Sequence, residues 1–345
     1  MQSVSNETRT VAGAAGSAKG LAGKRAGLST ITSRFAMLGL LALLVLVFSL
    51  LRPTSFATAA NASTILLENA ILAILALAVM MPLVVNEFDL SVASVMGMAA
   101  MLAAGMSSRQ GAPVWLIFVT IALFGLVIGS VHAFLVVKLK LPSFIVTLGT
   151  NSILIGMILL YSGGAVIYDA IPQAISALGT TEWFGVGVPV YVLAALVLVL
   201  WFILEKRPVG RLMYAVGSNE QAARLAGIKS GRVRAGVMIL ASLIACLAGL
   251  LLTARVGSAS PTTFNAYFLP AFAAAFLSLA AFKPGQYNPL GVVTSVYLIG
   301  VGLSGLSLLG VPSWMEPVFH GLALVGAIGI SRLLTKGSGR SITPP

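Results

Sequence analysis

The chain has 345 residues, of which 58% are hydrophobic and 9% charged, and its formal net charge is +12. An ordinary soluble domain carries about 25% charged residues, so this composition excludes a soluble enzyme, a disordered protein and a secreted disulfide scaffold. The single cysteine, Cys246, excludes an intrachain disulfide and a site of clustered cysteines. Lipid is therefore the expected solvent for most of the chain.

Residues 1–34 are rich in Gly, Ala, Ser and Thr and carry five basic residues. Such a segment buries too little apolar surface to order itself, so a disordered basic cytoplasmic tail is predicted. Its sequence GSAKGLAGKR resembles a phosphate-binding loop, but Arg25 follows Lys24 where such a loop needs Ser or Thr. We therefore expect this chain to bind no nucleotide or other cofactor itself.

Ten apolar runs follow the tail, and about 20 apolar residues are enough for one membrane crossing. The runs lie at residues 35–51, 63–85, 90–106, 113–137, 143–161, 188–204, 233–254, 268–282, 289–309 and 315–334. The sequence ATAANA after the first run resembles a signal-peptide cleavage site, but 34 residues before the run are long for a signal peptide, which favours an uncleaved helix. The predicted fold is an all-α polytopic membrane protein with about ten transmembrane helices over 35–334 and a C-terminal tail over 335–345.

The basic residues predict how these helices are oriented. With the N-terminus in the cytoplasm and alternating crossings, the inward segments hold 18 of the 21 Lys and Arg residues, and only Arg52, Arg109 and Arg255 face outward. This arrangement follows the positive-inside rule, which the opposite orientation violates. Both termini are therefore predicted to be cytoplasmic, and the positive charge needs no nucleic-acid partner to explain it.

Few residues could carry chemistry inside the membrane. The two histidines, His132 and His320, lie in different runs without a carboxylate or cysteine at helical spacing, so no metal site is predicted. Glu68 is the one carboxylate well inside a run, and it is either a functional residue or a side chain that reaches the outer interface. Because no nucleophile–base set accompanies it, we do not expect an enzyme.

Two polar segments separate apolar runs. In VVNEFDLSVASVMGM, the carboxylate of Asp89 is predicted to cap a helix that starts at Leu90. In LPSFIVTLGTNSI, hydroxyl residues recur at helical spacing, which serves either helix packing or a solute path. The candidate lining of that path is Asp89, Ser91, Ser143, Phe144, Thr147 and Thr150.

The inward connection over 205–233 is the most hydrophilic stretch after the tail. Ser218 followed by Gln221 is a capping-box pattern, which predicts a short helix over about 219–226 that ends at Gly227. The helix would present a face of small residues, namely Ala222, Ala223 and Ala226. Such a helix either docks into a groove of another protein or lies against its own chain.

Three segments resemble one known family. GRLMYAVGSNEQAARLAGI resembles the coupling loop in permease subunits of ribose/xylose-type sugar ABC importers, which belong to the branched binding-protein-dependent transport permease family. FDLSVASVMGMAA and LPSFIVTLGTNSI resemble that family's I-D-L-S-V-G-S-x-M and P-S-F-I-V-T-L-G-T segments, although Asn86 and Glu87 stand where the family usually has two glycines. The coupling residues that the resemblance implies are Gly210, Arg211, Asn219, Glu220, Ala222, Ala223 and Gly227.

The resemblance implies a transport subunit without its own ATPase or other catalytic site. It would form the pathway for a sugar or sugar-like solute across a bacterial inner membrane, together with a second permease subunit. A periplasmic binding protein would deliver the solute, and separate ATP-binding cassette subunits would hydrolyse ATP. The alternative is an ion-coupled secondary transporter, which is expected to show mid-membrane charges in paired halves, whereas the sequence has only Glu68 and no clear internal repeat.

Overall fold

The computed structural model describes residues 35–168 and 171–336, so the predicted tails over 1–34 and 337–345 lie outside it. Each of the ten predicted apolar runs is helical. In chain order, these helices are Phe35–Leu51, α2 (Ala59–Val84), α3 (Val92–Ser108), α4 (Val114–Ala133), α5 (Ser143–Ser162), α7 (Val188–Trp201), α10 (Ser230–Val256), α11 (Asn265–Leu277), α12 (Pro289–Leu308) and α13 (Met315–Lys336).

Shorter elements extend or connect these helices. α4 and α7 continue as the π-helices η1 (Phe134–Lys138) and η2 (Phe202–Lys206), and α11 continues as the 3-10 helix η3 (Ser278–Ala280). The connection between α5 and α7 forms α6 (Gln173–Thr180) and a small antiparallel hairpin of β1 (Glu182–Trp183) and β2 (Val186–Gly187). The connection between α7 and α10 forms α8 (Pro208–Ser218) and α9 (Glu220–Leu225).

Six of the described helices are long and apolar enough to cross a membrane: α2, α4 with η1, α5, α7 with η2, α10 and α12. Three more, namely Phe35–Leu51, α3 and α11 with η3, are apolar but shorter. The structure therefore confirms the predicted all-α polytopic membrane fold.

The central helix of the bundle is α2, whose inner two thirds are almost completely buried. α10 packs against α2, α3 and α4, and α11 and α12 pack against α2 as well. Small residues permit these close approaches: Gly249 of α10 lies against the backbone of Met96, and Gly129 of α4 lies against the backbone of Ile239. Helices in lipid associate through such packing because lipid provides no hydrophobic drive between them.

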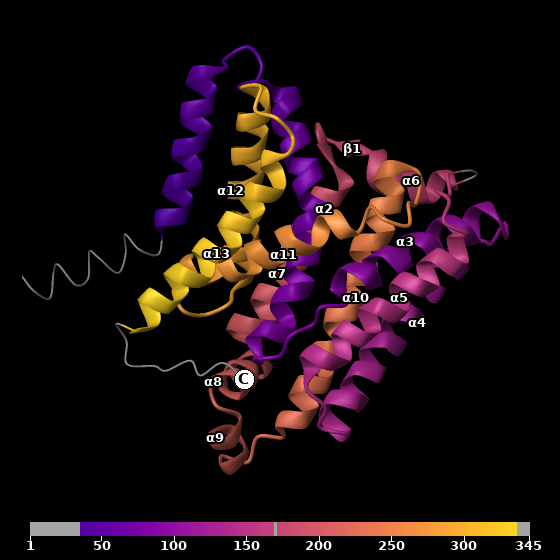
Figure 1. Ribbon diagram of the computed structural model, residues 1–345, viewed down its shortest axis with the longest axis vertical. Helices are drawn as coiled ribbons and strands as arrows, with labels where there is room; N and C mark the ends of the chain where they lie inside the picture. The colour runs from indigo at the N-terminus through magenta and orange to yellow at the C-terminus, as the bar shows by residue number, and fades with distance from the viewer. Residues whose placement is uncertain (1–34, 169–170, 337–345) are drawn as a thin grey trace, which may run out of the picture.

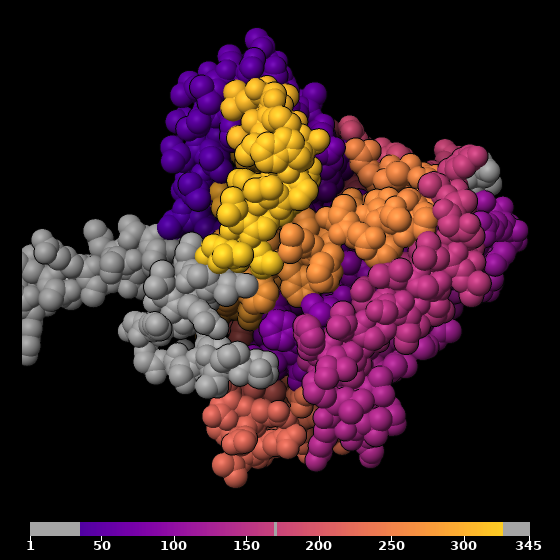
Figure 2. Space-filling model, in the orientation of Figure 1, coloured from indigo at the N-terminus to yellow at the C-terminus, as the bar shows by residue number. Residues whose placement is uncertain are grey.

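The two ends of the bundle carry different connections. α8 and α9 lie at one end, and β1 and α6 lie towards the other (Figure 1). α8 and α9 protrude from the body of the molecule there (Figure 2). The loop that the sequence predicts to be cytoplasmic thus lies at the end opposite the hairpin.

Candidate functional site

The short helix predicted in the inner loop is α9, and Asn219 caps its N-terminus. The Oδ1 atom of Asn219 accepts the N–H of Ala222 at 2.9 Å, and its backbone is extended, with a φ of −161°. The prediction that Ser218 and Gln221 form a capping box is wrong, because α8 continues through Ser218 and leaves Asn219 as the first non-helical residue. The predicted helix itself is present over Glu220–Leu225.

Gly227 ends α9, as predicted. Its φ is +82°, in the left-handed region that favours glycine. The N–H of Gly227 donates to the carbonyl of Arg224 at 2.9 Å, and the N–H of Ile228 donates to the carbonyl of Ala223 at 3.0 Å. This pair of bonds is a Schellman motif, so α9 is fixed at both ends although it is short.

The predicted face of three alanines is divided between two sides of α9. Ala223 is buried in the core of the chain itself, whereas Ala222 and Ala226 are exposed. Leu225, beside them, is 92% exposed. One side of α9 therefore holds the helix to the bundle, and the other presents an apolar surface with a leucine side chain at its end.

Two glycines allow α8 to pack closely against η2 and α2. A Cβ on Gly210 would collide with the backbone of Leu204 in η2, and one on Gly217 would collide with the backbone of Val84, the last residue of α2. Arg211, between them in the chain, is exposed. Gly210 thus acts through close packing, and Arg211 lies on the surface.

Arg234, near the start of α10, joins α9 to the segment that follows α2. Its guanidinium pairs with the carboxylate of Glu87 and, at 3.3 Å, with Oε1 of Glu220. The side chains of Arg234 and Glu87 are only 15% and 11% exposed. We call Glu87, Arg234 and Glu220 the ionic clasp. It connects residues far apart in the sequence at the base of the protruding loop.

Glu220 is held in the clasp by further partners. Arg224 pairs with its Oε1 at 2.9 Å, and the Oγ–H of Ser230 donates to the same atom at 3.0 Å. Burial raises the pKa of Glu220, but the hydrogen bond from Ser230 and the charges of Arg234 and Arg224 outweigh it, so the pKa lies below 4.5. Glu220 is therefore ionised at neutral pH.

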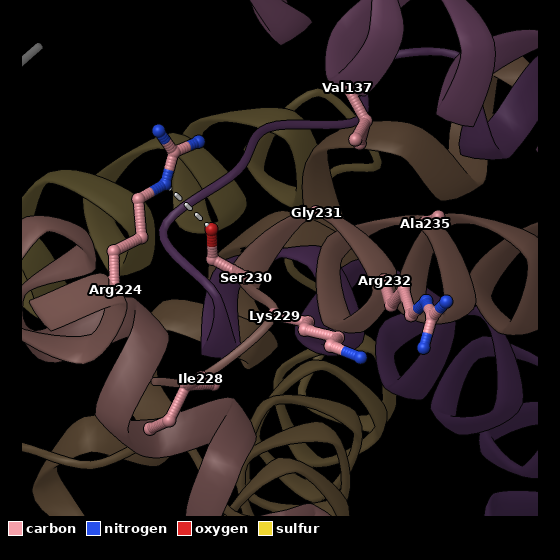
Figure 3. A pocket seen from close by; sticks show the side chains of 8 residues that line it. All are labelled: Val137, Arg224, Ile228, Lys229, Ser230, Gly231, Arg232 and Ala235. Atoms are coloured by element: carbon pink, nitrogen blue, oxygen red, sulfur yellow. Dashed lines mark hydrogen bonds between the residues drawn. The ribbon is translucent and has the colours of Figure 1, made fainter. Parts of the chain in front are cut away.

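An open groove of about 550 Å³ lies beside α9, between the start of α10 and the end of η1. Arg224, Lys229 and Arg232 contribute its basic side chains (Figure 3). Figure 3 also shows Arg224 turned towards Ser230, to which its Nε–H donates at 2.9 Å. Because Arg224 is paired with Glu220, Lys229 and Arg232 give the groove its net positive charge, which favours a ligand or surface with acidic groups.

The segment that follows α2 contains Asn86 and Glu87, at the positions where the family that this chain resembles has two glycines. Asn86 has a φ of +59°, and the N–H of Glu87 donates to the carbonyl of Pro82 at 3.0 Å. Asparagine is one of the few residues other than glycine that adopts this left-handed conformation readily. The helix thus ends without glycine, and the side chain of Glu87 becomes available to Arg234.

Asp89 does not cap a helix that starts at Leu90, because α3 begins at Val92. The Oδ1 atom of Asp89 instead accepts the N–H of Ser91 at 2.9 Å and its Oγ–H at 2.6 Å, which is an Asx turn just before the helix. The Oδ2 atom lies 3.7 Å from Nδ1 of His132, and both side chains are buried. His132 was not predicted beside Asp89, because a contact between separate helices leaves no local spacing in the sequence.

Most of the predicted path residues join this same polar network. The Oγ of Ser143 accepts the N–H of Phe88 at 3.2 Å, and Oγ1 of Thr147 accepts the N–H of Leu90 at 3.1 Å. Oγ1 of Thr150 lies 3.1 Å from Nε2 of His132. We call the non-helical residues 85–91, between α2 and α3, the break. These contacts hold the break against α4 and α5.

Phe144 is the exception among the six, because its side chain is 51% exposed on α5. It makes none of the hydrogen bonds that join Asp89, Ser91, Ser143, Thr147 and Thr150 to the break or to His132.

Residues 61–328 match the family described as a branched-chain amino acid transport system, permease component. The chain belongs to this family. The permease is 34% identical over 299 residues to the ribose import permease protein RbsC of Bacillus subtilis and 30% identical over 291 residues to RbsC of Haemophilus influenzae, and each alignment covers 84% of this chain and 90% of the relative. It is 28% identical to the L-arabinose transport system permease protein AraH of Escherichia coli, over 89% of this chain and 92% of that relative. No solved structure matches this permease.

This permease is therefore a multi-pass membrane subunit of an ABC importer, as the three sequence segments predicted. Family membership favours this interpretation over an ion-coupled secondary transporter. The relatives are transport subunits rather than enzymes.

Proposed function

We propose that this permease forms the translocation pathway of a bacterial inner-membrane importer for a sugar or sugar-like solute. The relatives named for the import of ribose and for the transport of L-arabinose and D-allose support this solute class. In this proposal ten helices cross the membrane and both termini are cytoplasmic. The ten helical runs and the basic residues of the α8–α9 loop support that topology.

We infer that α9 is the docking element for separate ATP-binding cassette subunits, which hydrolyse ATP while this chain binds no cofactor. The observation that carries this inference is the 92% exposure of Leu225 on a helix capped at both ends and held by the ionic clasp. A large apolar side chain on a fixed, protruding helix is suited to a groove in a partner protein. A periplasmic binding protein and a second permease subunit complete the proposed importer.

The same contacts suggest how the movement of an ATPase subunit reaches the membrane. When α9 moves, Glu220 moves with it. Arg234 contacts both Glu220 and Glu87, so the movement displaces Glu87 just after the end of α2. Glu87 lies in the break that Ser143 and Thr147 hold against α5. We propose that the ionic clasp transmits the stroke to this break, where α2, α3 and α5 change their relative packing.

The test of the docking proposal is Leu225→Asp, with Leu139→Asp as the matched control because Leu139 is another exposed leucine, in the connection between η1 and α5. Burial of a leucine side chain contributes about 1.5–3 kcal/mol, so Leu225→Asp should weaken ATPase docking about 10- to 100-fold. The measurement is the amount of ATPase subunit that co-purifies with each variant, together with ATP-dependent uptake. Equal co-purification with both variants would contradict docking at α9.

A further inference from the structure

A larger cavity lies far from the coupling loop, between α2, α11, α12 and α13. Its volume is about 640 Å³, within the range of about 300–1,000 Å³ that small-molecule pockets occupy. α11 and α12 pack against the central helix α2 and against each other, and α13 packs against α11 (Figure 1). The polar side chains that matter for its chemistry are those of Asn61, Glu68, Asn69, Tyr267, Glu316 and His320.

The cavity lies in the half of the bundle opposite α9. Glu68 is in the first half of α2, Ser304 is near the end of α12, and Glu316 is in the first turn of α13. In the alternating topology, each of these segments lies towards the outer side of the membrane. A solute released by a binding protein on that side would meet this cavity before the inner half of the bundle.

The side chains at the cavity wall include two carboxylates, which are strong hydrogen-bond acceptors, as well as amide and hydroxyl groups. One Nδ2–H of Asn61 donates to the carbonyl of Phe56, and one Nδ2–H of Asn69 donates to the carbonyl of Ile65, which commits half of these amide protons to the chain itself. Glu68 is exposed at the wall, and no ion pair among the described residues includes it. The carboxylate of Glu68 is therefore available to accept hydrogen bonds from a polar ligand.

One glycine makes room for a polar side chain at the cavity wall. A Cβ on Gly300 of α12 would collide with the amide of Asn69, so glycine leaves space for that side chain. Glu68 and Glu316 give the wall two carboxylates, with His320 as the nearby basic group. Carboxylates repel anionic solutes and accept strong hydrogen bonds from hydroxyl groups. The wall is thus complementary to a solute that is rich in O–H donors and has no negative charge.

We propose that this cavity is an outer vestibule that binds the hydroxyl groups of a polyhydroxylated solute, with Glu68 as a principal acceptor. The inference rests on the proposed function, because it takes the solute class from the sugar-importing relatives. It adds a binding site within the permease itself, at residues that are separate from the ionic clasp and from the network around Asp89.

The first test uses the complete importer in cells and a membrane-impermeant maleimide added from outside. Ser304→Cys places a thiol at the cavity, Ser295→Cys places one at a completely buried position on the same helix, and Ser313→Cys places one at an exposed position before α13. The natural Cys246 is buried. We expect Ser304→Cys to react at a rate near that of Ser313→Cys. A rate as low as that of Ser295→Cys overturns the vestibule.

The second test measures uptake with D-ribose, L-arabinose and D-allose as probes, each at low concentration. Glu68→Gln keeps the shape of the side chain and removes its charge, and Glu182→Gln makes the same change in β1, away from the cavity. Because a hydrogen bond to a charged group contributes about 1.5–3 kcal/mol, we expect Glu68→Gln to lower uptake tenfold or more. Glu182→Gln should match the unmodified permease.

The outcomes separate the vestibule from the proposed function. Uptake by Glu68→Gln equal to that by Glu182→Gln overturns the vestibule and leaves the importer intact. If the unmodified permease imports none of the three probes and binds no ATPase subunit, the proposed function fails, and the maleimide rates still decide whether the cavity opens outward. ATPase co-purification with Glu68→Gln establishes that the variant is folded.

Discussion

Removal of the Arg234 guanidinium tests the ionic clasp, and Arg234→Met is the suitable change because it keeps an unbranched side chain of similar reach. Arg234 lies between a buried carboxylate, Glu87, and a more exposed one, Glu220. The variant leaves the charge of Glu87 without its partner. It also separates α9 from the break after α2, while the capping bonds of α9 stay in place.

The size of the effect follows from the burial of the two pairs. The loss of one partner from a buried ion pair costs about 3–5 kcal/mol, and this figure applies to Glu87, whose side chain is 11% exposed. The pair with Glu220 is screened by solvent and contributes about 0.2–1 kcal/mol. Arg234→Met should therefore lower the free energy of unfolding by about 3–5 kcal/mol. The double variant Glu87→Gln with Arg234→Met should recover much of this loss, because no charge is then left unpaired.

The assay measures thermal unfolding, ATP hydrolysis and solute uptake of the reconstituted importer. We expect Glu87→Gln with Arg234→Met to be stable and to hydrolyse ATP, but to import little solute for each ATP hydrolysed. Lys283→Met is the control, because it breaks the ion pair of Lys283 with Glu205, outside α9. Normal uptake for each ATP hydrolysed in the double variant would refute transmission through the clasp.

Three further predictions concern local geometry. Gly227→Val should weaken ATPase docking by about 1–2 kcal/mol, because a φ of +82° is unfavourable for a residue with a side chain. Gly227→Asn should weaken docking less, and equal ATPase co-purification with the two variants would contradict this account. His132→Phe should lower the free energy of unfolding by about 1–3 kcal/mol, because it removes the hydrogen bond between Nε2 of His132 and Oγ1 of Thr150 and the imidazole 3.7 Å from Oδ2 of Asp89. Adding Asp89→Asn should recover part of this loss, and no recovery would contradict a role for the contact with Asp89. Because the pKa of Glu220 is lowered from 4.5, its stabilising contribution is present above that value and is lost as the pH falls through the lowered pKa; ATPase docking should stay constant over about pH 5–8, and a decline there would exclude this role.

The sequence predicted the membrane helices well because one property, apolar character over a sufficient length, determines them. The inner loop was predicted less completely, and α8 was not distinguished within it. Pro208 at the first turn of α8 and the buried Met213 and Val216 form a helical pattern, but the hydrophilic residues around them obscured it. The cap of α9 was assigned one residue early for the same reason.

The buried polar contacts could not be predicted, because they join residues far apart in the sequence. Asp89 lies beside His132, and Glu87 lies beside Arg234, through the packing of α4 and α10 rather than through local spacing. One sequence feature did point to them. Three polar residues in the otherwise apolar stretch around VVNEFDL require partners, because unpaired buried charges are costly.

The most direct test of the central claim is a cross-link between α9 and the ATPase subunit in the purified importer. Leu225→Cys provides an exposed thiol, Leu139→Cys is the control, and the natural Cys246 is buried. We predict that a short thiol–amine cross-linker joins Leu225→Cys to an ATPase subunit and leaves Leu139→Cys unlinked. An importer that carries its ATPase subunit but cross-links only through Leu139→Cys would contradict docking at α9.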